Sequence, residues 1–389
     1  MTDLIFLAAT TIPADPDGMK MWAYVGFIAL VVVFLGLDLG VFHREAHEVS
    51  MKESMLWSAI WLACGLSFSG FVYYSYQHHW LGLGWATPAY AAGAIVLGEV
   101  TGAAAAIQYL TGYIVEKSLA MDNIFVIAMI FSYFAIPAKY QHRVLFWGII
   151  GALMMRGGMI YLGAELIIRY TWILIIFGIF LVLTALKMAL IKSHSDPGKN
   201  PVVRIAKRFF RTVDFYDGQK FFTFRTVSPT YMKDATGRDI QAPAEPGTLS
   251  ARRAVTPLFL ALIMVEVTDL VFAVDSIPAI FAITPDPFIV FTSNIFAILG
   301  LRALYFCLAA LISRFRFLKP ALILILAFVG IKLLLLAAPP YFNDFGLSAG
   351  EVMSIKIDPL VSLAVVLGTL VVATVLSVLL PAKEAGKTA

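Results

Sequence analysis

The chain has 389 residues, of which 60% are hydrophobic and 14% charged, with a formal net charge of +4. Soluble globular domains carry about 25% charged residues, so this composition excludes an ordinary soluble enzyme, a nucleic-acid-binding protein and a disordered scaffold. The apolar runs are long and continuous rather than alternating, which favours an all-α polytopic membrane protein over a β-barrel. The two cysteines form neither a disulfide framework nor a Cys-rich metal site.

The N-terminal residues 1–21 have no basic n-region, so we expect an exposed tail rather than a signal peptide. Nine runs of about 20 apolar residues follow, the length that a helix needs to cross the hydrocarbon core. They cover residues 22–42, 55–76, 109–136, 144–167, 172–192, 255–283, 288–312, 319–338 and 358–381. The predicted units are two N-terminal helices (22–76), an outer-face insert (77–108), a three-helix repeat (109–192), a basic loop (193–254), a second repeat (255–338), and a last helix with its tail (339–389).

Residues 89–107 are apolar enough to suggest a tenth span, although they are rich in Gly and Ala and contain Glu99. The positive-inside rule decides between nine and ten spans. With nine, every basic segment falls on one face, including 193–254, which alone holds eleven Lys and Arg residues. We therefore predict a multi-pass protein of the cytoplasmic (inner) membrane, with its N-terminus outside and its C-terminus in the cytoplasm. Residues 89–107 then become an outer-face helix or a re-entrant segment.

The loop 193–254 mixes basic and aromatic residues, as in KNPVVRIAKRFFRTVDF. We expect it to lie on anionic lipid, with docking of a membrane or metal-delivery partner as the alternative. It has too few aliphatic residues for a catalytic domain. Nucleic acid is not expected to be a partner.

An internal repeat is visible in the order acid, Asp, small polar residue, Arg, Lys. The order occurs twice: Glu116, Asp122, Asn123, Arg156 and Lys187 in residues 109–192, and Asp269, Asp275, Ser276, Arg302 and Lys332 in residues 255–338. In the predicted topology the first unit starts outside and the second inside, so the two repeats are inverted. Secondary transporters of this plan bind substrate near the bilayer midplane, at the interface of the repeats.

The segments that carry this repeat also resemble a known family. LTGYIVEKSLAMDNIFV, VEVTDLVFAVDSIPAIFAIT and DPFIVFTSNIFAILGLRALYF are similar to signatures of the TerC/Alx family of integral membrane proteins, and FHREAHEVSMKESMLWS resembles its longer, Alx-like branch. The resemblance covers nearly the whole chain, with a longer 77–108 insert. It implies manganese export from the cytoplasm, and the family name refers to tellurium resistance. It also implies transport roles for Glu116, Asp122, Glu266, Asp269 and Asp275.

Ionised carboxylates inside a bilayer are costly unless they are paired or solvated, so five acids on two spans need a reason. Carboxylate, amide and hydroxyl oxygens suit hard ions such as Mn²⁺, Ca²⁺ and Mg²⁺. The candidate metal ligands are Glu116, Asp122, Asn123, Glu266, Asp269, Asp275 and Ser276, and Asn294 offers a further oxygen. Purely structural ion pairing is the alternative, with Arg156, Arg302, Lys187 and Lys332 balancing the charge. Lys187, Lys332 and Lys117 also suit snorkelling to the interface.

The acids of each span do not share one face of a straight helix, so either they form successive sites or the helices are broken. Pro278 cannot donate to the carbonyl of Val274, and we predict a break near 274–277.

No P-loop, nucleophile elbow or HExxH motif is present, so we expect neither an enzyme nor a bound cofactor. The sequence therefore predicts a secondary transporter exporting Mn²⁺, with proton exchange as a hypothesis. The alternatives are another hard cation such as Ca²⁺, an oxyanion bound by the arginines, or a non-transporting scaffold in metal delivery, tellurite resistance or envelope stress.

Overall fold

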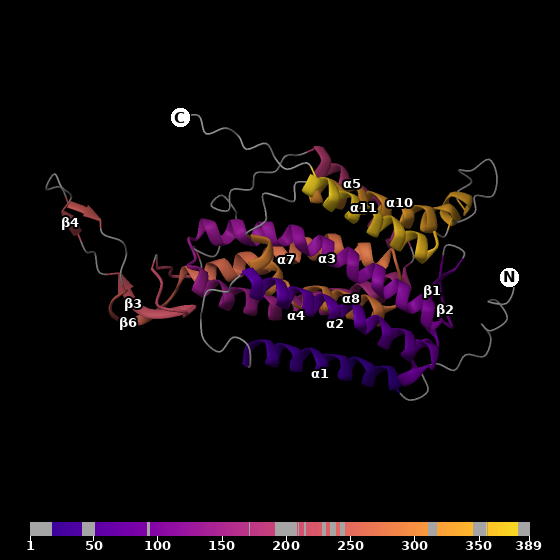
Figure 1. Cartoon of the computed structure of the whole chain (residues 1–389), viewed down its shortest axis with the longest axis horizontal. Coiled ribbons are helices and arrows are strands. Elements are labelled where there is room, and N and C mark those ends of the chain that lie inside the picture. The colour runs from indigo at the N-terminus through magenta and orange to yellow at the C-terminus, as the bar shows by residue number, and fades with distance from the viewer. Residues whose placement is uncertain are drawn as a thin grey trace.

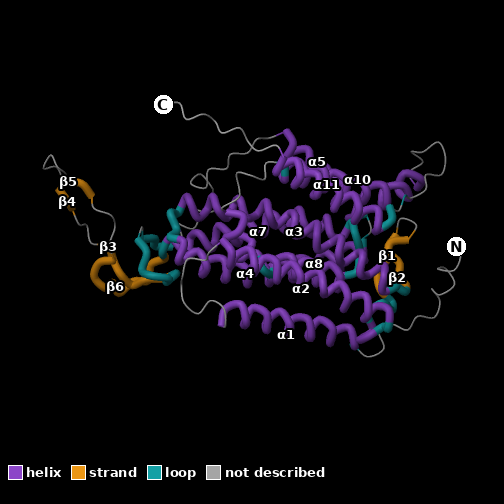
Figure 2. The backbone as a smooth tube through the Cα atoms, viewed as in Figure 1, coloured by secondary structure: helices purple, strands orange, loops and turns teal. Residues whose placement is uncertain are grey.

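Long helices dominate the computed structural model (Figures 1 and 2). They are α1 (Met19–Gly40), α2 (Met51–Gln77), α3 (Gly102–Tyr133), α4 (Ala138–Arg169), α5 (Ile173–Leu190), α7 (Pro257–Phe281), α8 (Pro287–Ile298), α9 (Leu301–Ala309), α10 (Leu318–Asp344) and α11 (Pro359–Leu379), with a 3₁₀ turn at Trp80–Gly82. The structure describes residues 18–40, 51–91, 94–170, 172–190, 208, 210–213, 215–227, 231–233, 239–241, 246–309, 317–344, 355 and 357–379. Most of the predicted tail 1–21 and the residues 380–389 lie outside this range, as does much of 193–254.

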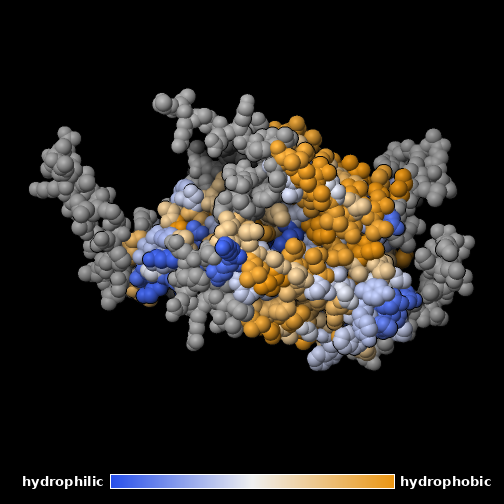
Figure 3. Space-filling model, in the orientation of Figure 1, coloured by the Kyte–Doolittle hydropathy of each residue, from blue (hydrophilic) through white to orange (hydrophobic). Residues whose placement is uncertain are grey.

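Among the described residues, seven helices are long and apolar enough to cross a membrane, and the bent pair α8–α9 makes an eighth. The remaining predicted span, 109–136, corresponds to α3, which is 32 residues long but carries Glu116, Lys117 and Asp122 in its middle. The prediction of an all-α polytopic membrane protein is confirmed. Figure 3 agrees with it, because hydrophobic residues cover most of the middle of the visible face and hydrophilic ones gather toward its two ends.

For residues 89–107 the sequence predicts an outer-face helix or a re-entrant segment, and a separate helix over this range is wrong. Residues there form an antiparallel hairpin of β1 (Thr87–Ala91) and β2 (Ala94–Gly98), and α3 begins directly after it. Thr101 caps α3 by accepting a hydrogen bond from the amide of Ala104, which fixes the start of the helix at Gly102. The hairpin is anchored by Tyr90, whose hydroxyl donates to the carbonyl of Phe281 at the end of α7.

The predicted break near 274–277 is also wrong, because α7 runs as one helix from Pro257 to Phe281 with Pro278 inside it. Pro278 stands in the last turn, so the hydrogen bond that it removes is one of the last of the helix. The residues around it, from Ser276 to Phe281, are buried and hold the turn by packing. A break does occur in the next span, between α8 and α9.

The two predicted repeats pack reciprocally in the bundle. The hairpin that precedes α3 and the β6 strand that precedes α7 lie at opposite ends, so α3 and α7 run in opposite directions (Figure 1). Helix α3 packs on α8 while α7 packs on α4, and α5 packs on α10. Each repeat thus places its first helix against the second helix of the other.

Short strands lie at the end of the bundle where α7 begins. There β3 (Phe222–Val227) pairs with β6 (Pro246–Val255), and β4 (Tyr231–Lys233) pairs with β5 (Asp239–Gln241). These strands belong to the predicted basic loop 193–254.

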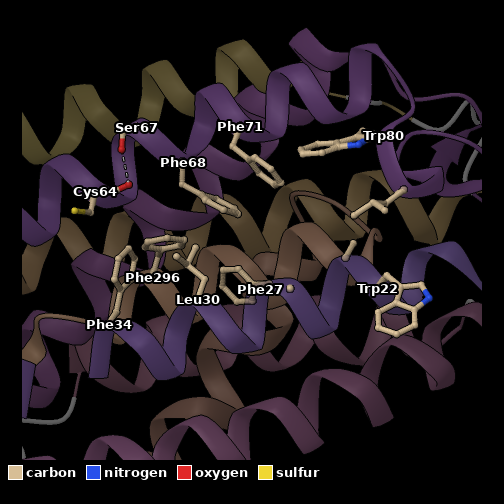
Figure 4. A pocket seen from close by; sticks show the side chains of 13 residues that line it. Trp22, Phe27, Leu30, Phe34, Cys64, Ser67, Phe68, Phe71, Trp80 and Phe296 are labelled. Atoms are coloured by element: carbon tan, nitrogen blue, oxygen red, sulfur yellow. Dashed lines mark hydrogen bonds between the residues drawn. The ribbon is translucent and has the colours of Figure 1, made fainter. Parts of the chain in front are cut away.

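Helix α1 lies at the edge of the bundle and meets it through aromatic side chains. Phe27 contacts the rings of Phe68 on α2 and Phe296 on α8, at centroid distances of 5.5 and 5.7 Å. A cavity of about 540 Å³ remains between α1 and α2, lined by these rings and by other apolar side chains (Figure 4). This lining offers a metal ion almost no ligands, so this cavity is not the predicted site.

Candidate functional site

A buried arginine, Arg156 of α4, lies where α3, α4, α7 and α8 meet. Its Nη1 forms an ion pair with Oε1 of Glu116 on α3. Its Nε and Nη2 donate to Oδ2 and Oδ1 of Asp269 on α7, at 3.0 and 2.7 Å. The side chains of Arg156 and Glu116 are 1% exposed and that of Asp269 is 13% exposed. One guanidinium group therefore joins carboxylates from both predicted repeats.

Neutral polar side chains complete the surroundings of Arg156. Its Nη1 also donates to Oδ1 of Asn294 on α8 at 3.2 Å and to Oγ of Ser276 on α7 at 3.5 Å. Asn123 donates from Nδ2 to Oδ1 of Asp269 at 3.4 Å. These contacts supply hydrogen bonds but no positive charge, so two carboxylates share a single guanidinium.

Several buried oxygen atoms at this point have no hydrogen-bond donor. Within the described residues they are Oε2 of Glu116, Oδ1 of Asn123 and Oε2 of Glu266. A buried acceptor left without a partner costs about 1–3 kcal/mol, more when it is charged. A cation bound here would remove that cost, so the cluster has unused capacity for a ligand.

Two small cavities flank the cluster. One of about 30 Å³ is lined by apolar side chains together with Glu116, Asn123, Arg156, Asp275 and Ser276. Another of about 20 Å³ is lined by apolar side chains together with Asn123, Thr268 and Asp269. Asn123 and Phe272 line both cavities, so these two side chains form the wall between them. Each space is of the size that one water molecule or one small ion needs.

The remaining predicted acids have different surroundings. Asp275 lines the larger of these two cavities and accepts a hydrogen bond from Oγ1 of Thr184 on α5 at 3.1 Å. Glu266 lies one turn before Asp269 on α7, and its carboxylate fills the place where a Cβ atom on Gly151 of α4 would stand. The backbone of Asp122 belongs to α3, but its side chain lies outside the described part of the chain.

The four predicted charge-balancing residues do not share one environment. Arg156 binds the acids directly, and Arg302 is buried on α9. Lys332 is buried on α10 and donates to Oγ of Ser362 on α11 at 2.9 Å, so it does not snorkel. Lys187 is exposed on α5.

Lys117 does not snorkel either. Its Nζ turns toward α8 and donates to the carbonyls of Ala297 and Leu299 at 3.1 and 3.4 Å.

Sequence reasoning grouped Glu116, Asn123, Asp269, Asp275 and Ser276, and the structure places all five around Arg156 or its cavities. Sequence reasoning missed Thr184 and Gly151. The sequence gives no signal for either, because Thr184 is a lone hydroxyl and Gly151 a lone glycine in an apolar run. Among the described residues, no three carboxylate, imidazole or thiolate groups converge to hold a metal ion. In this arrangement the guanidinium of Arg156 holds the carboxylates.

Comparison with known proteins agrees with this membrane architecture. Residues 101–385 match the model of the integral membrane protein TerC family. An uncharacterized membrane protein of Myxococcus xanthus is 40% identical over 351 residues, which cover 90% of this chain and 89% of that protein. Alx of Escherichia coli (strain K12), a candidate membrane-bound redox modulator by its name, is 41% identical over 85% of this chain and 91% of its own.

The corresponding Alx of Photorhabdus laumondii is 43% identical over 85% of this chain and 90% of its own. No solved structure gives a significant match. The family match spans most of the chain, and these relatives align over nearly their full length. The chain therefore belongs to the TerC family of integral membrane proteins.

Proposed function

We propose that this protein is a secondary transporter that exports Mn²⁺ from the cytoplasm through the carboxylate cluster of α3 and α7. The observation that carries the proposal is the excess of acidic oxygen over basic partners. Glu116 and Asp269 share the single guanidinium of Arg156, and acceptor atoms of Glu116, Asn123 and Glu266 have no donor within the described residues. Hard oxygen ligands of this kind suit Mn²⁺ rather than thiophilic ions.

In the proposed cycle, Arg156 takes the place of the cation when no ion is bound. An ion coming from the end of the bundle where α7 begins meets Glu266 and then Asp269, one turn further along the helix. Passage beyond the wall formed by Asn123 and Phe272 brings the ion into the cavity beside Asp275, where it meets oxygens of Asp275, Glu116 and Asn123. There its charge competes with the guanidinium of Arg156 for the carboxylate of Glu116.

Proton exchange is the coupling that we propose. Carboxylates that release a divalent cation inside a bilayer are left with uncompensated charge, and a proton removes it. We expect Mn²⁺ efflux to accelerate when an imposed pH gradient drives protons in the opposite direction. Indifference of Mn²⁺ flux to the gradient would exclude this coupling and leave the site proposal standing.

The decisive experiment is Mn²⁺ flux into proteoliposomes that contain purified protein and a fluorophore quenched by Mn²⁺. We expect flux with the wild type and its loss in Asp275→Asn and Glu116→Gln. Glu165→Gln is the matched control, because Glu165 is half exposed and pairs with Arg169 on the same helix, away from the cluster. Ca²⁺ and Mg²⁺ tested as competitors of Mn²⁺ identify the preferred ion.

The alternatives give different results in the same assay. A Ca²⁺ transporter moves Ca²⁺ and is insensitive to Mn²⁺, whereas an oxyanion carrier depends on Arg156 and Arg302 rather than on the acids. A scaffold gives no flux at all, and its role depends on the loop 193–254. The Alx relatives are named as redox modulators, and direct thiol chemistry in this chain would have to use Cys64 or Cys307. Our proposal assigns these cysteines no role, so the double Cys→Ala variant should transport normally.

A further inference from the structure

The span formed by α8 and α9 is interrupted at Leu299 and Gly300, and the two helices meet at a bend of 40°. Leu299 has a non-helical conformation (φ −56°, ψ 133°) and Gly300 has a φ of +77°, a value that favours glycine. Trp61 of α2 lies against Gly300, where an added Cβ atom would be 2.5 Å from the Cβ of Trp61. The break is therefore specified by its sequence and by its packing.

A helix that ends inside the bundle leaves its last carbonyl groups without intrahelical donors. Ala297 and Leu299 are buried, so water does not readily supply those donors. The ammonium group of Lys117, which comes from α3, supplies them by binding both carbonyl oxygens. Carbonyls freed at broken membrane helices are also the ligands that transporters use for monovalent cations.

The lysine lies in repeat one and the break that it contacts lies in repeat two, and neither has a counterpart at the matching position of the other repeat. Lys117 follows the first acid of repeat one, and its counterpart in repeat two is Leu270, which is 39% exposed. Gly300 stands two residues before the arginine of repeat two, and its counterpart in repeat one is Met154, inside the unbroken helix α4. The first helix of repeat two packs on the unbroken helix α4 and has no lysine at this position.

We propose that the break between α8 and α9 is a monovalent-cation site whose permanent occupant is the ammonium group of Lys117. The lysine acts as a tethered cation that satisfies the carbonyls and holds α9, with Arg302, in its orientation. A chain without this amine should bind a free Na⁺, K⁺ or small alkylammonium ion in its place. The wild type, whose site is already filled, should need none.

The test uses the full purified protein in detergent and needs no transport assay, so its failure is distinguishable from failure of the proposed function. Thermal unfolding is followed in choline, sodium, potassium and ethylammonium chloride at equal ionic strength, for the wild type and Lys117→Ala. Lys139→Ala is the matched control, because Lys139 is exposed at the start of α4 beside the ring of Tyr140.

We expect Lys117→Ala to lower Tm by about 3–8 °C in choline, the consequence of leaving buried carbonyls unpaired. Ethylammonium or one of the alkali cations should restore about half of the loss or more, while the wild type and Lys139→Ala keep the same Tm in all four salts. A loss that no cation restores, no loss at all, or an equal response of the wild type to the same cation would overturn the proposal.

A second pair of variants covers the case in which Lys117→Ala does not fold. Lys117→Arg keeps a cation at the carbonyls, and Lys117→Gln keeps a neutral hydrogen-bond donor. Recovery of folded protein with Arg but not with Gln supports a cation site. A Gln variant as stable as the wild type shows that no charge is needed and overturns the proposal.

Discussion

Arg156 of α4 binds both carboxylate oxygens of Asp269 on α7, with Nε at 3.0 Å and Nη2 at 2.7 Å. A planar guanidinium matches a carboxylate in this two-bond geometry, which an ammonium group cannot reproduce. The same guanidinium reaches Glu116 on α3. Three helices are thus held by one buried cation.

Removing that cation should destabilise the fold strongly. Arg156→Met leaves Glu116 and Asp269 buried without a positive partner, and we expect the free energy of unfolding to fall by about 3–5 kcal/mol. The measurement is chemical unfolding in mixed micelles, followed by tryptophan fluorescence.

Arg169→Met is the control for the same substitution. Arg169 pairs with Glu165 one turn away, but the two side chains are 66% and 47% exposed, and such pairs contribute at most about 1 kcal/mol. Equal stability of the two variants would show that Arg156 does not hold the three helices together.

Gly151 of α4 makes room for the carboxylate of Glu266, since an added Cβ atom would overlap that group. Gly151→Ala should therefore displace Glu266 from the cluster and reduce Mn²⁺ flux in proteoliposomes to a small fraction of the wild-type rate.

Gly158→Ala lies on the same helix with nothing within 4 Å of its Cβ position, and it should transport normally. If Gly151→Ala also transports at the wild-type rate, the position of Glu266 does not matter to transport.

The sequence predicts the nine helical segments well because hydrocarbon thickness sets the length of each apolar run. It also predicts that Glu116, Asp269 and Arg156 belong together, since each is a costly charge within an apolar span. Which acid meets Arg156 depends on how α3, α4 and α7 pack, and no local signal encodes that.

The wrong predictions also concern features that depend on tertiary packing rather than on local sequence. Pro278 was expected to break α7, but it stands in the last turn among buried neighbours that keep the helix intact. Lys117 was expected to snorkel, whereas a broken helix 180 residues away in the sequence supplies it with carbonyl partners. Residues 89–107 contain a hairpin whose short strands bond to each other, although their apolar composition suits a helix equally well.

Gly300 should tolerate no side chain. Its φ of +77° disfavours any L residue, and a Cβ atom would collide with Trp61. Gly300→Ala should lower the free energy of unfolding by about 1–3 kcal/mol from the backbone strain alone, with the collision adding to the loss. Chemical unfolding in mixed micelles measures the change.

Gly368→Ala provides the comparison, because Gly368 lies within α11 with nothing near its Cβ position. Alanine favours a helix over glycine by about 1 kcal/mol, so this variant should be as stable as the wild type or more stable. If Gly300→Ala were as stable as Gly368→Ala, the backbone between α8 and α9 would accommodate a side chain at no cost in free energy.

The orientation in the membrane gives the last prediction. Glu99 beside the β1–β2 hairpin and Lys220 near β3 lie at opposite ends of the bundle, and their side chains are similarly exposed, at 61% and 65% (Figure 1). Basic residues concentrate in the loop that holds Lys220, so the positive-inside rule predicts that this end lies in the cytoplasm. A membrane-impermeant thiol reagent added to intact cells should label Glu99→Cys and spare Lys220→Cys, in a background where Cys64 and Cys307 are alanine.

Permeabilised cells serve as the control, since both single-cysteine variants should then react to a similar extent. Labelling of Lys220→Cys but not Glu99→Cys in intact cells would reverse the orientation. The fold and the cluster around Arg156 would be unchanged by that result. An ion from the cytoplasm would then meet the cavity beside Asp275 before it meets Asp269, which is the reverse of the proposed export path.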